Sequence, residues 1–392
     1  MENHQTEVAI VGGGMVGAAV ALGLAREGFE VVVIEQQIPQ PIAASSLPDV
    51  RVSAISSASV SFLRGLDAWR RVQAVRSHPY TRLETWEWQQ AHVIFDAREL
   101  GLPELGYMVE NNVLQWALWE QLQQHPRVRC LSPVTLSAMH RSASGPYQLQ
   151  FADGQRLTAS LVVGADGANS RIRQWAGIGI HAWEYDQSCM LVSVQCDDAP
   201  GEATWQEFTP DGPRAFLPLF DNWASLAWYD SPARIRQLQS MPMAQLQREI
   251  ARAFPARLGK VTPLACGGFP LVRRHALHYV QDGIALVGDA AHTIHPLAGQ
   301  GVNLGYRDAE TLIDVLARAR NYGECWHSEA VLKRYQRRRQ PDNFLMQSGM
   351  DLFYAGFSNR LEPLKIVRNL GLMAAQRSGA LKRQALRYAL GL

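Results

Sequence analysis

The first 35 residues carry the hydrophobic pattern of a strand, a helix and a second strand. A short apolar run at 8–11 is followed by glycines, and a helical pattern then continues to about Arg26, with Gly28 as its stop signal. Apolar residues return at 30–35 and form the second strand. This order predicts a βαβ unit at the start of the chain.

Further along the chain, the hydrophobic pattern changes to a period of two. Strand-like alternation recurs in the segments 134–140, 147–151 and 157–163. Residues 188–229 are again strand-like and rich in aromatic side chains, with a hairpin turn at 210–213. A helix at 244–254, a buried strand at 284–287 and a mainly helical remainder follow. We therefore predict an α/β protein whose second sheet is largely antiparallel.

Composition and charge narrow the classes of function. Of the 392 residues, 47% are hydrophobic and 19% are charged, which is typical of a globular protein. With 38 basic and 36 acidic side chains, the net charge is only +2, so the chain does not resemble a nucleic-acid-binding protein. Five cysteines without a C-x-x-C pair predict reduced thiols and argue against disulfides or a zinc ribbon.

The sequence also bears on the compartment. The N-terminus lacks the basic region of a secretory signal, and no uninterrupted apolar stretch reaches the length of about 18 residues that a spanning helix requires. We therefore expect a cytoplasmic protein that can still touch a membrane surface.

The glycine-rich turn has the spacing of a dinucleotide-binding fingerprint. Gly12, Gly14 and Gly17 fit G-x-G-x-x-G, which permits a tight turn, close approach of the backbone to a pyrophosphate and close helix packing. Glu35 lies 18 residues after Gly17 at the end of the next strand, where a carboxylate can accept hydrogen bonds from a ribose. These residues predict a Rossmann-type domain that binds either FAD or NAD.

Two further strings occur later in the chain. Gly164-Ala165-Asp166-Gly167-Ala168-Asn169-Ser170-Arg171 follows a buried strand, and Gly288-Asp289-Ala290-Ala291-His292 leads through Pro296 to Gly299-Gln300-Gly301-Val302-Asn303. Together with the first fingerprint, and in this order, they resemble the single-component FAD-dependent aromatic hydroxylases. The resemblance spans essentially the whole cofactor domain and implies FAD as the cofactor.

The resemblance implies roles for the residues of the last string. In that family, the aspartate that matches Asp289, next to Gly288, bonds the ribityl chain of the flavin. The segment that matches Pro296, Gly299 and Gly301 passes the flavin ring, with a helix N-terminus near its pyrimidine end. Backbone donors placed there stabilise negative charge on the reduced flavin.

Other residues are assigned by the same resemblance. Arg51 matches an arginine near the flavin and the pyrophosphate, and Gln115 matches a position that reaches the flavin. Asp166 matches a position that touches both the flavin region and the path of NAD(P)H. His292 and His295 are two histidines without further ligands, so we predict no metal site.

Several strings bring the chain closest to the ubiquinone-biosynthesis subgroup. They are Asp49-Val50-Arg51-Val52-Ser53-Ala54-Ile55-Ser56, the segment from Gly288 to Pro296, and Ala298-Gly299-Gln300-Gly301-Val302-Asn303-Leu304-Gly305. Within the subgroup, Thr85-Trp86-Glu87-Trp88 and Ser348-Gly349-Met350-Asp351-Leu352-Phe353-Tyr354 suggest a demethoxy-ubiquinol hydroxylase. The resemblance implies a monooxygenase that uses O2, through a flavin C4a-hydroperoxide, to hydroxylate the ring of a demethoxy-ubiquinol intermediate. Because the cofactor carries this chemistry, we nominate no catalytic side chain. The reductant stays open between transiently bound NAD(P)H and another donor.

Two other functions fit the same residues. One is an FAD hydroxylase that acts at another ring position or on another lipid phenol, and the other is a non-catalytic, flavin-bound subunit of a quinone-biosynthesis complex. For a polyprenylated quinol or phenol substrate, the aromatic sheet at 204–229 is the candidate wall, although ordinary core packing explains any one of its aromatic residues equally well.

Sheet segments at both ends of the chain imply interrupted domains. We expect an FAD-binding domain at 1–76, 104–180 and 276–345, and a substrate-binding sheet domain at 77–103 and 181–275. Residues 346–392 form a basic helical C-terminal region in this division.

The C-terminal region has an uneven charge pattern. Between 363 and 392 it contains no Asp or Glu and six basic residues, namely Lys365, Arg368, Arg377, Lys382, Arg383 and Arg387. Apolar residues interleave with them, as in a basic amphipathic helix that rests on anionic lipid or on a partner protein. A solvated helical face is the alternative. The first interpretation places the enzyme peripherally on the inner face of the cytoplasmic membrane, or within a ubiquinone-biosynthesis complex.

Overall fold

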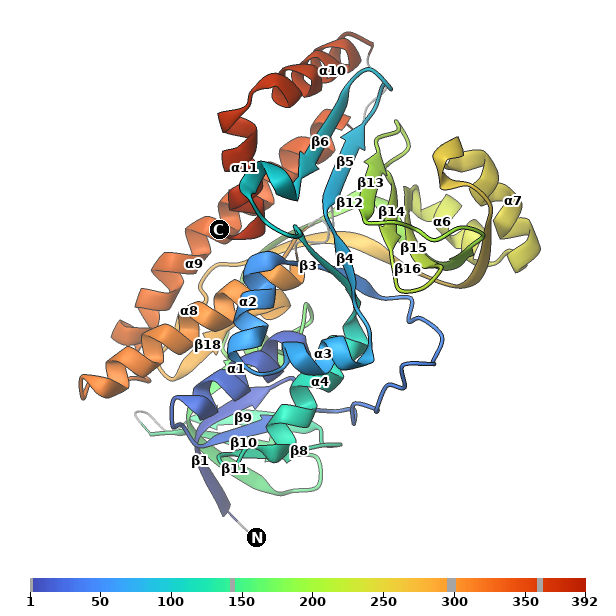
Figure 1. Cartoon of the computed structure of the whole chain (residues 1–392). Coiled ribbons are helices and arrows are strands. Elements are labelled where there is room, and N and C mark those ends of the chain that lie inside the picture. Colours follow the sequence, from blue (N-terminus) through green and yellow to red (C-terminus); the bar gives the residue numbers. More distant parts are fainter. Residues whose placement is uncertain (1–2, 142–144, 295–300, 358–361) are drawn as a thin grey trace.

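The computed structural model describes residues 3–141, 145–294, 301–357 and 362–392, and its strands form three sheets (Figure 1). The first sheet has the order β17-β18-β11-β1-β2-β8, and β10 and β9 continue from β11. Its strands are β1 (Asn3–Val11), β2 (Val31–Ile34), β8 (Val128–Leu131), β9 (Leu136–Arg141), β10 (Tyr147–Phe151), β11 (Arg156–Gly164), β17 (Val280–Gln281) and β18 (Ile284–Leu286).

The centre of this sheet is parallel and fully buried. β1 pairs in parallel with β11 and β2, and β11 pairs in parallel with β18. Strands of such a sheet are covered on both faces, which explains the continuous apolar runs at 8–11 and 31–34. Helices α1 (Met15–Arg26), α4 (Asn111–Gln124) and α8 (Gly301–Asn321) pack together beside it. The predicted βαβ unit is confirmed, and Gly28, just beyond α1, has a φ of +89°.

The second sheet is antiparallel except at one pair. Its order is β19-β16-β12-β15-β14-β13-β5-β6, in which β13 and β5 are parallel. The strands are β5 (Arg82–Trp86), β6 (His92–Asp96), β12 (Ile180–Cys196), β13 (Ala203–Glu207), β14 (Arg214–Pro218), β15 (Trp223–Asp230), β16 (Val261–Ala276) and β19 (His292–Thr293). The expected aromatic, mainly antiparallel sheet is therefore present.

One face of the second sheet is covered by α6 (Pro232–Gln239) and α7 (Met243–Ala253). Met190, Val192 and Val194 of β12 lie in that core, together with residues of both helices. Because successive residues of a strand point to opposite faces, Cys189, Leu191 and Ser193 lie on the other face, from which Ser193 contacts the Asp49 carbonyl oxygen.

Smaller elements join the two large sheets. A third sheet contains β3 (Val52–Ser56), β7 (Gly106–Glu110) and β4 (His78–Tyr80), in that order. The short helices are α2 (Ser57–Gly65), α3 (Trp69–Val75), α5 (Arg171–Trp175), η1 (Ala97–Leu100), η2 (Ala256–Leu258) and η3 (Gly288–Ala290).

The C-terminal part is helical. Helix α9 (Glu329–Phe357) packs along α8, and α10 (Glu362–Arg377) and α11 (Ala380–Leu390) follow it, with α10 beside the edge strand β6 (Figure 1). None of the helices within the described residues combines the length and the apolar character that crossing a bilayer requires.

β16 was not recognisable from the hydrophobic pattern, because it contains Pro263, Pro270 and a Gly267-Gly268 pair. Both prolines lie where the pairing with β12 shifts register, and prolines in sheets are tolerated at such irregularities. The division of the chain into domains stays a prediction.

Candidate functional site

Three sequence motifs meet at one edge of the parallel sheet. In the register, Val11 at the end of β1 lies beside Gly164 at the end of β11, and Gly164 lies beside Leu286 at the end of β18. The G-x-G-x-x-G turn, the Asp166 string and the Asp289 string each follow one of these ends. Ligands of open α/β sheets bind in the crevice outside the carboxyl ends of the strands, which is where this edge lies.

The three fingerprint glycines differ in what surrounds them. Gly12 has a φ of +101°, and a Cβ there would lie 2.3 Å from the carbonyl oxygen of Ala165. A Cβ on Gly17 would lie 2.0 Å from the carbonyl oxygen of Gly12, so both glycines are required by packing within the protein. A Cβ on Gly14, in contrast, would have nothing within 4 Å. The open space at Gly14 is where a bound pyrophosphate needs close access to the backbone.

The helix that follows the turn can receive an anion. Gly14 is the N-cap of α1, no side chain caps the helix, and its first turn has no acidic residue. The partial positive charge of the helix N-terminus therefore faces the open side of the turn.

Glu35 and Gln115 both contact the glycine turn itself. Glu35 Oε2 accepts a hydrogen bond from the Gly13 amide at 2.6 Å. The Gly13 carbonyl accepts hydrogen bonds from Gln115 Nε2 at 2.9 Å and from Trp119 Nε1 at 2.7 Å. The structure thus places Gln115 as a support of the turn. Trp119 supports the turn in the same way. The sequence did not reveal this role, because a tryptophan at a buried position of a helix is typical of a hydrophobic core.

Asp166 is also engaged locally. Its carboxylate accepts hydrogen bonds from Ser170 Oγ at 2.5 Å, from the Arg171 amide at 2.7 Å and from the Ile172 amide at 3.2 Å. These donors lie at the start of α5, so the carboxylate stabilises that helix N-terminus. The backbone of Ala165 and Asp166 packs against Gly12, so Asp166 lies beside the glycine turn, and its contact with the flavin stays a prediction.

Arg51 and Asp289 come from distant parts of the chain and act on each other electrostatically. The Asp289 side chain is solvent-accessible, yet protein surrounds it closely enough that burial raises the pKa of its carboxyl. The charges of His292, Arg51 and Arg274 oppose this rise. Arg51 is exposed, and its amide donates to Asp49 Oδ1 at 2.7 Å. A hydroxyl-rich or phosphate-bearing ligand placed here would meet a carboxylate and a guanidinium.

The segment that carries Arg51 is fixed by a buried ion pair. Arg76 and Glu110 form two hydrogen bonds, of 2.6 and 2.7 Å, and both side chains are almost completely buried. Glu110 Oε1 also accepts the Asp49 amide at 2.6 Å. Arg76 donates to the carbonyl oxygens of Ala44, at 3.1 Å, and Ser46, at 2.5 Å, so the pair fixes the chain leading to Arg51.

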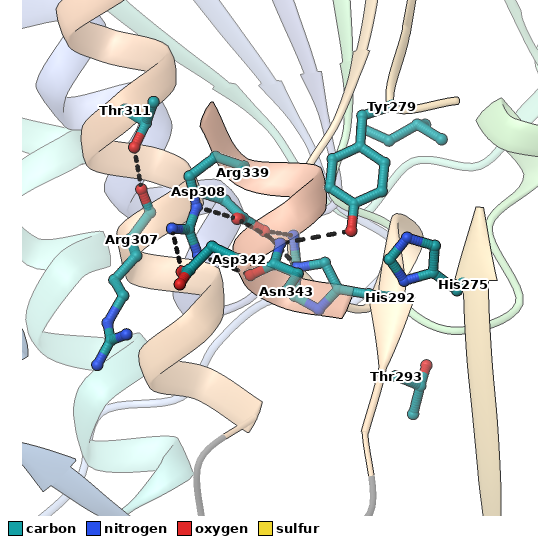
Figure 2. A network of polar contacts seen from close by, with 12 residues as sticks. His275, Tyr279, His292, Thr293, Arg307, Asp308, Thr311, Arg339, Asp342 and Asn343 are labelled. Carbon is teal, nitrogen blue, oxygen red and sulfur yellow. Dashed lines mark hydrogen bonds and ion pairs between the residues drawn. The ribbon is translucent and has the colours of Figure 1, made fainter. Parts of the chain in front are cut away.

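Asp308 anchors the turn that presents Asp289, and Figure 2 shows Asp308 among its side-chain partners His292, Arg339 and Asn343. This fully buried carboxylate accepts hydrogen bonds from the Gly288 amide (3.1 Å) and from His292 Nε2 (2.5 Å). Its other oxygen accepts Arg339 Nε (2.9 Å) and Asn343 Nδ2 (3.0 Å) from α9. Asp308 therefore ties the Gly288-Asp289 turn to both long helices.

The charge state of Asp308 follows from these donors. Burial alone would raise the pKa of its carboxyl, but His292, Arg339 and Asn343 outweigh burial and lower the pKa to about 2. An ionised Asp308 keeps all four donors attached at neutral pH.

The anchor residues were missed in the sequence, although a signal exists. Asp308 lies between Leu304 and Leu312, four residues from each, on the buried stripe of α8. In α9, Arg339 and Asn343 continue the buried stripe of Tyr335 in the same way. A charged residue at such a position is a candidate for a buried pair.

The remaining predicted residues lie at the same edge or cannot be placed. Gly301 is the first residue of α8. Pro296 and Gly299 lie outside the described residues. Within the described ranges, no group of three or more His, Cys, Asp or Glu side chains is arranged to hold a metal ion.

An apolar face of the second sheet lies opposite. The Arg51 guanidinium is 6.0 Å from the Phe269 ring centre, and Ser193 Oγ contacts the Asp49 carbonyl oxygen at 3.4 Å. Phe269 and Leu191 pack against a buried cluster on the same face, formed by Tyr185, Cys189, Ala215, Ala227, Tyr229 and Leu271. An aromatic ring would find an apolar wall there, next to Arg51.

Comparison with known proteins agrees with this geometry. Residues 5–344 match the family model described as FAD binding domain. The chain belongs to this family, and it is an FAD-dependent monooxygenase. It is 70% identical over all 392 residues to the 3-demethoxyubiquinol 3-hydroxylase of Escherichia coli, with 100% of both chains covered. It is 36% identical over 386 residues to the ubiquinone hydroxylase UbiL of Rhodospirillum rubrum, covering 98% of this chain and 89% of that protein.

Solved structures share the fold. PqsL of Pseudomonas aeruginosa, described as a probable FAD-dependent monooxygenase, superposes with a TM-score of 0.79 at 23% identity over 95% of this chain and all of that one. The p-nitrophenol 4-monooxygenase PnpA of Pseudomonas putida has a TM-score of 0.83 at 18% identity over 99% and 98% of the two chains. The predicted fold class is confirmed.

Proposed function

We propose that this enzyme hydroxylates the ring of a demethoxy-ubiquinol intermediate in ubiquinone biosynthesis. The observation that carries the proposal is the 70% identity over the full chain to a 3-demethoxyubiquinol 3-hydroxylase. The relative at 36% identity, named a ubiquinone hydroxylase, supports the same pathway.

The geometry fits FAD as the cofactor. Gly14 leaves space for a pyrophosphate at the N-terminus of α1, and Asp289 and Arg51 supply an acceptor and a cation beside it. When bound, the flavin supplies the activation of O2 and the transfer of a hydroxyl group to the ring. The protein has to hold the substrate ring near the flavin and keep water away, and the apolar face around Phe269 and Leu191 suits both tasks.

A lipid-quinone profile of cells that lack this protein tests the proposal. We expect the demethoxy intermediate to accumulate, and the wild-type gene to restore ubiquinone. Accumulation of an earlier ring intermediate would instead indicate hydroxylation at another position. A variant that folds normally but cannot bind flavin tests the alternative of a non-catalytic subunit. If this variant restores ubiquinone in the cells, the protein is a scaffold subunit of a quinone-biosynthesis complex.

We further propose that the enzyme meets its lipid substrate at an anionic membrane surface through the C-terminal region. Two of the six basic residues cannot take part, since they are buried. Arg368 pairs with Glu87, and Lys382 donates to Glu99 Oε1 at 2.8 Å and to the Ile94 carbonyl oxygen at 2.9 Å. These two side chains attach α10 and α11 to Glu87 and Glu99 and so add nothing to a basic outer surface.

The outer side of this region still suits a membrane. Arg377, Arg383 and Arg387 are exposed. So are four apolar side chains of α10, namely Leu364, Ile366, Val367 and Leu370. Exposed apolar side chains and exposed cations in one region, without acidic residues between 363 and 392, are features of interfacial helices.

Charge reversal tests the membrane proposal. The triple variant with Arg377, Arg383 and Arg387 changed to Glu should lose affinity for phosphatidylglycerol vesicles on the order of 100-fold, because each basic group near an anionic surface contributes about 1 kcal/mol. Reversal of three exposed arginines on α6 and α7, Arg236, Arg248 and Arg252, serves as the control. Equal vesicle binding by both triple variants would contradict the proposal, and loss of a partner protein alone would indicate a protein interface.

A further inference from the structure

Gln187 carries one of the buried side-chain oxygens of the second sheet that have no hydrogen-bond partner among the described residues. Gln187 of β12 is 7% exposed, and its Nε2 donates to the Asp211 carbonyl oxygen at 3.2 Å. Its Oε1 is buried and has no hydrogen-bond partner among the described residues. Leaving a buried acceptor unpaired costs about 1–3 kcal/mol, so such a group calls for an explanation.

The orientation of this amide is fixed by its other half. Because Nε2 must donate to the Asp211 carbonyl, Oε1 points away from that turn. The turn itself is held close to the sheet: a Cβ on Gly212 would lie 2.8 Å from the Tyr229 carbonyl oxygen. The acceptor therefore cannot turn away without breaking a hydrogen bond.

Strand alternation places Gln187 on the same face of β12 as Cys189, Leu191 and Ser193. Along this part of β12, Tyr185, Gln187, Ser188 and Cys189 are buried while Asp186 is exposed. Tyr185 and Cys189 belong to the apolar cluster that Phe269 and Leu191 extend. The pairing of β12 with β16 is interrupted between Glu184 and Ser188, and such bulges re-aim side chains beside active sites.

The same face reaches the cofactor-binding residues through Phe269. The Phe269 ring centre is 6.0 Å from the Arg51 guanidinium, and the charge of Arg51 acts on Asp289. A ring lying on the cluster would therefore have Arg51 on one side and the Gln187 carbonyl within the same wall. The apolar neighbours leave Gln187 as a polar group that can orient the ring.

We propose that Gln187 Oε1 accepts a hydrogen bond from a ring hydroxyl of the substrate and so positions the ring. The proposal rests on the proposed function, because it takes a quinol as the ligand. A quinol carries hydroxyl donors, whereas the corresponding quinone carries only acceptors. Gln187 is thus a positioning residue that favours the reduced ring over the oxidised one.

Binding measurements on the FAD-loaded enzyme test this selectivity. Without oxygen or an electron donor, a demethoxy-ubiquinol with a short isoprenoid tail and its quinone are titrated separately, and tryptophan fluorescence reports the dissociation constants. We expect the wild type to bind the quinol about five- to tenfold more tightly than the quinone, which is the worth of one neutral hydrogen bond. Gln187→Met should bring this ratio close to one, mainly by weakening quinol binding.

A matched control and a second variant complete the test. Gln195→Met changes an exposed glutamine of the same strand and should keep the wild-type ratio. If Gln187→Met does not fold, Gln187→Asn retains the amide but withdraws the oxygen, and it should also lower the ratio. An unchanged ratio in a folded Gln187 variant overturns the proposal. A wild type that binds the quinol but forms no hydroxylated product counts against the proposed function instead.

Discussion

The two sides of the proposed cofactor site use their polar groups differently. At the carboxyl edge of the parallel sheet, Glu35, Gln115, Asp166 and Asp308 all bond to nearby backbone, so these side chains shape the turns. On the facing side of the second sheet the wall is largely apolar, and Gln187 Oε1 is a buried acceptor there that has no partner among the described residues. We infer that the edge of the parallel sheet holds the cofactor, which stays bound. The second sheet leaves this hydrogen-bond acceptor for the substrate, which binds and dissociates in each catalytic cycle.

The largest effect should follow the loss of the anchor at the first side. Asp308→Ala leaves Arg339 with Asp342 as its remaining ion-pair partner and removes the acceptor of His292, Asn343 and the Gly288 amide. Breaking a buried pair in this way costs about 3–5 kcal/mol of unfolding free energy. Urea unfolding measures it. Asp314→Ala on the same helix removes half-exposed ion pairs and should cost less than about 1 kcal/mol. Equal losses in both variants would show that Asp308 is no special anchor.

The same residue predicts a dependence on pH. The pKa of Asp308 is lowered from 3.8 to about 2 in the folded protein, so its contribution is complete above the ordinary aspartate range and is lost as the pH falls toward 2. The difference in unfolding free energy between the wild type and Asp308→Asn should therefore shrink as the pH falls from about 4 to 2. A constant difference over this range would contradict the assignment.

Gly14→Val should abolish flavin binding without unfolding the protein. The new side chain enters open space, and Gly14 has a φ of −67°, which any residue adopts. The purified variant should keep the melting temperature of the wild-type apoprotein and lose the flavin absorbance at about 450 nm, a property of the cofactor. Gly12→Ala is the contrasting variant and should damage the fold. Full absorbance in Gly14→Val would remove the pyrophosphate from this turn.

Asp289→Ala should weaken FAD binding more moderately. Loss of a charge-assisted hydrogen bond of about 1.5–3 kcal/mol corresponds to an affinity about 10- to 150-fold lower, measured by titrating apoprotein with FAD. Because burial raises the pKa of Asp289, its ionised form is disfavoured in the folded apoprotein, and the substitution should not reduce stability at neutral pH. Asp198→Ala, at an exposed site, serves as the control. An unchanged FAD affinity would exclude Asp289 from the site.

The smallest effect is expected at Gln115. Trp119 still donates to the Gly13 carbonyl oxygen in Gln115→Met, so the loss of stability should be about 0.5–1.5 kcal/mol. FAD affinity should change less than about twofold, since the side chain is engaged with the turn. A strong loss of FAD with unchanged stability would restore the flavin-contact role that the family resemblance implies.

Local motifs made the cofactor side predictable, whereas the substrate side depends on pairing between distant segments. Gly12, Gly14 and Gly17 stand close together in the sequence, and their spacing itself reports a turn and a ligand. The partner of Gln187, Asp211, lies 24 residues away, and β16 becomes a strand only through its pairing with β12. The inward direction of Arg368 and Lys382 likewise follows from Glu87 and Glu99, which no charge pattern within the C-terminal region reveals.

Helix α9 touches both sides of the site. Arg339 and Asn343 hold the Asp308 anchor, while Asp351, three turns further on, pairs with Arg273 of β16 at 2.8 Å. If the second sheet is exchanged between relatives, we therefore expect an active chimera only when α9 and the second sheet come from the same parent. A chimera joined within α9 would combine one parent's contacts to the Asp308 anchor with another parent's contacts to β16 on one continuous helix, and mismatches in one set of contacts would displace the other.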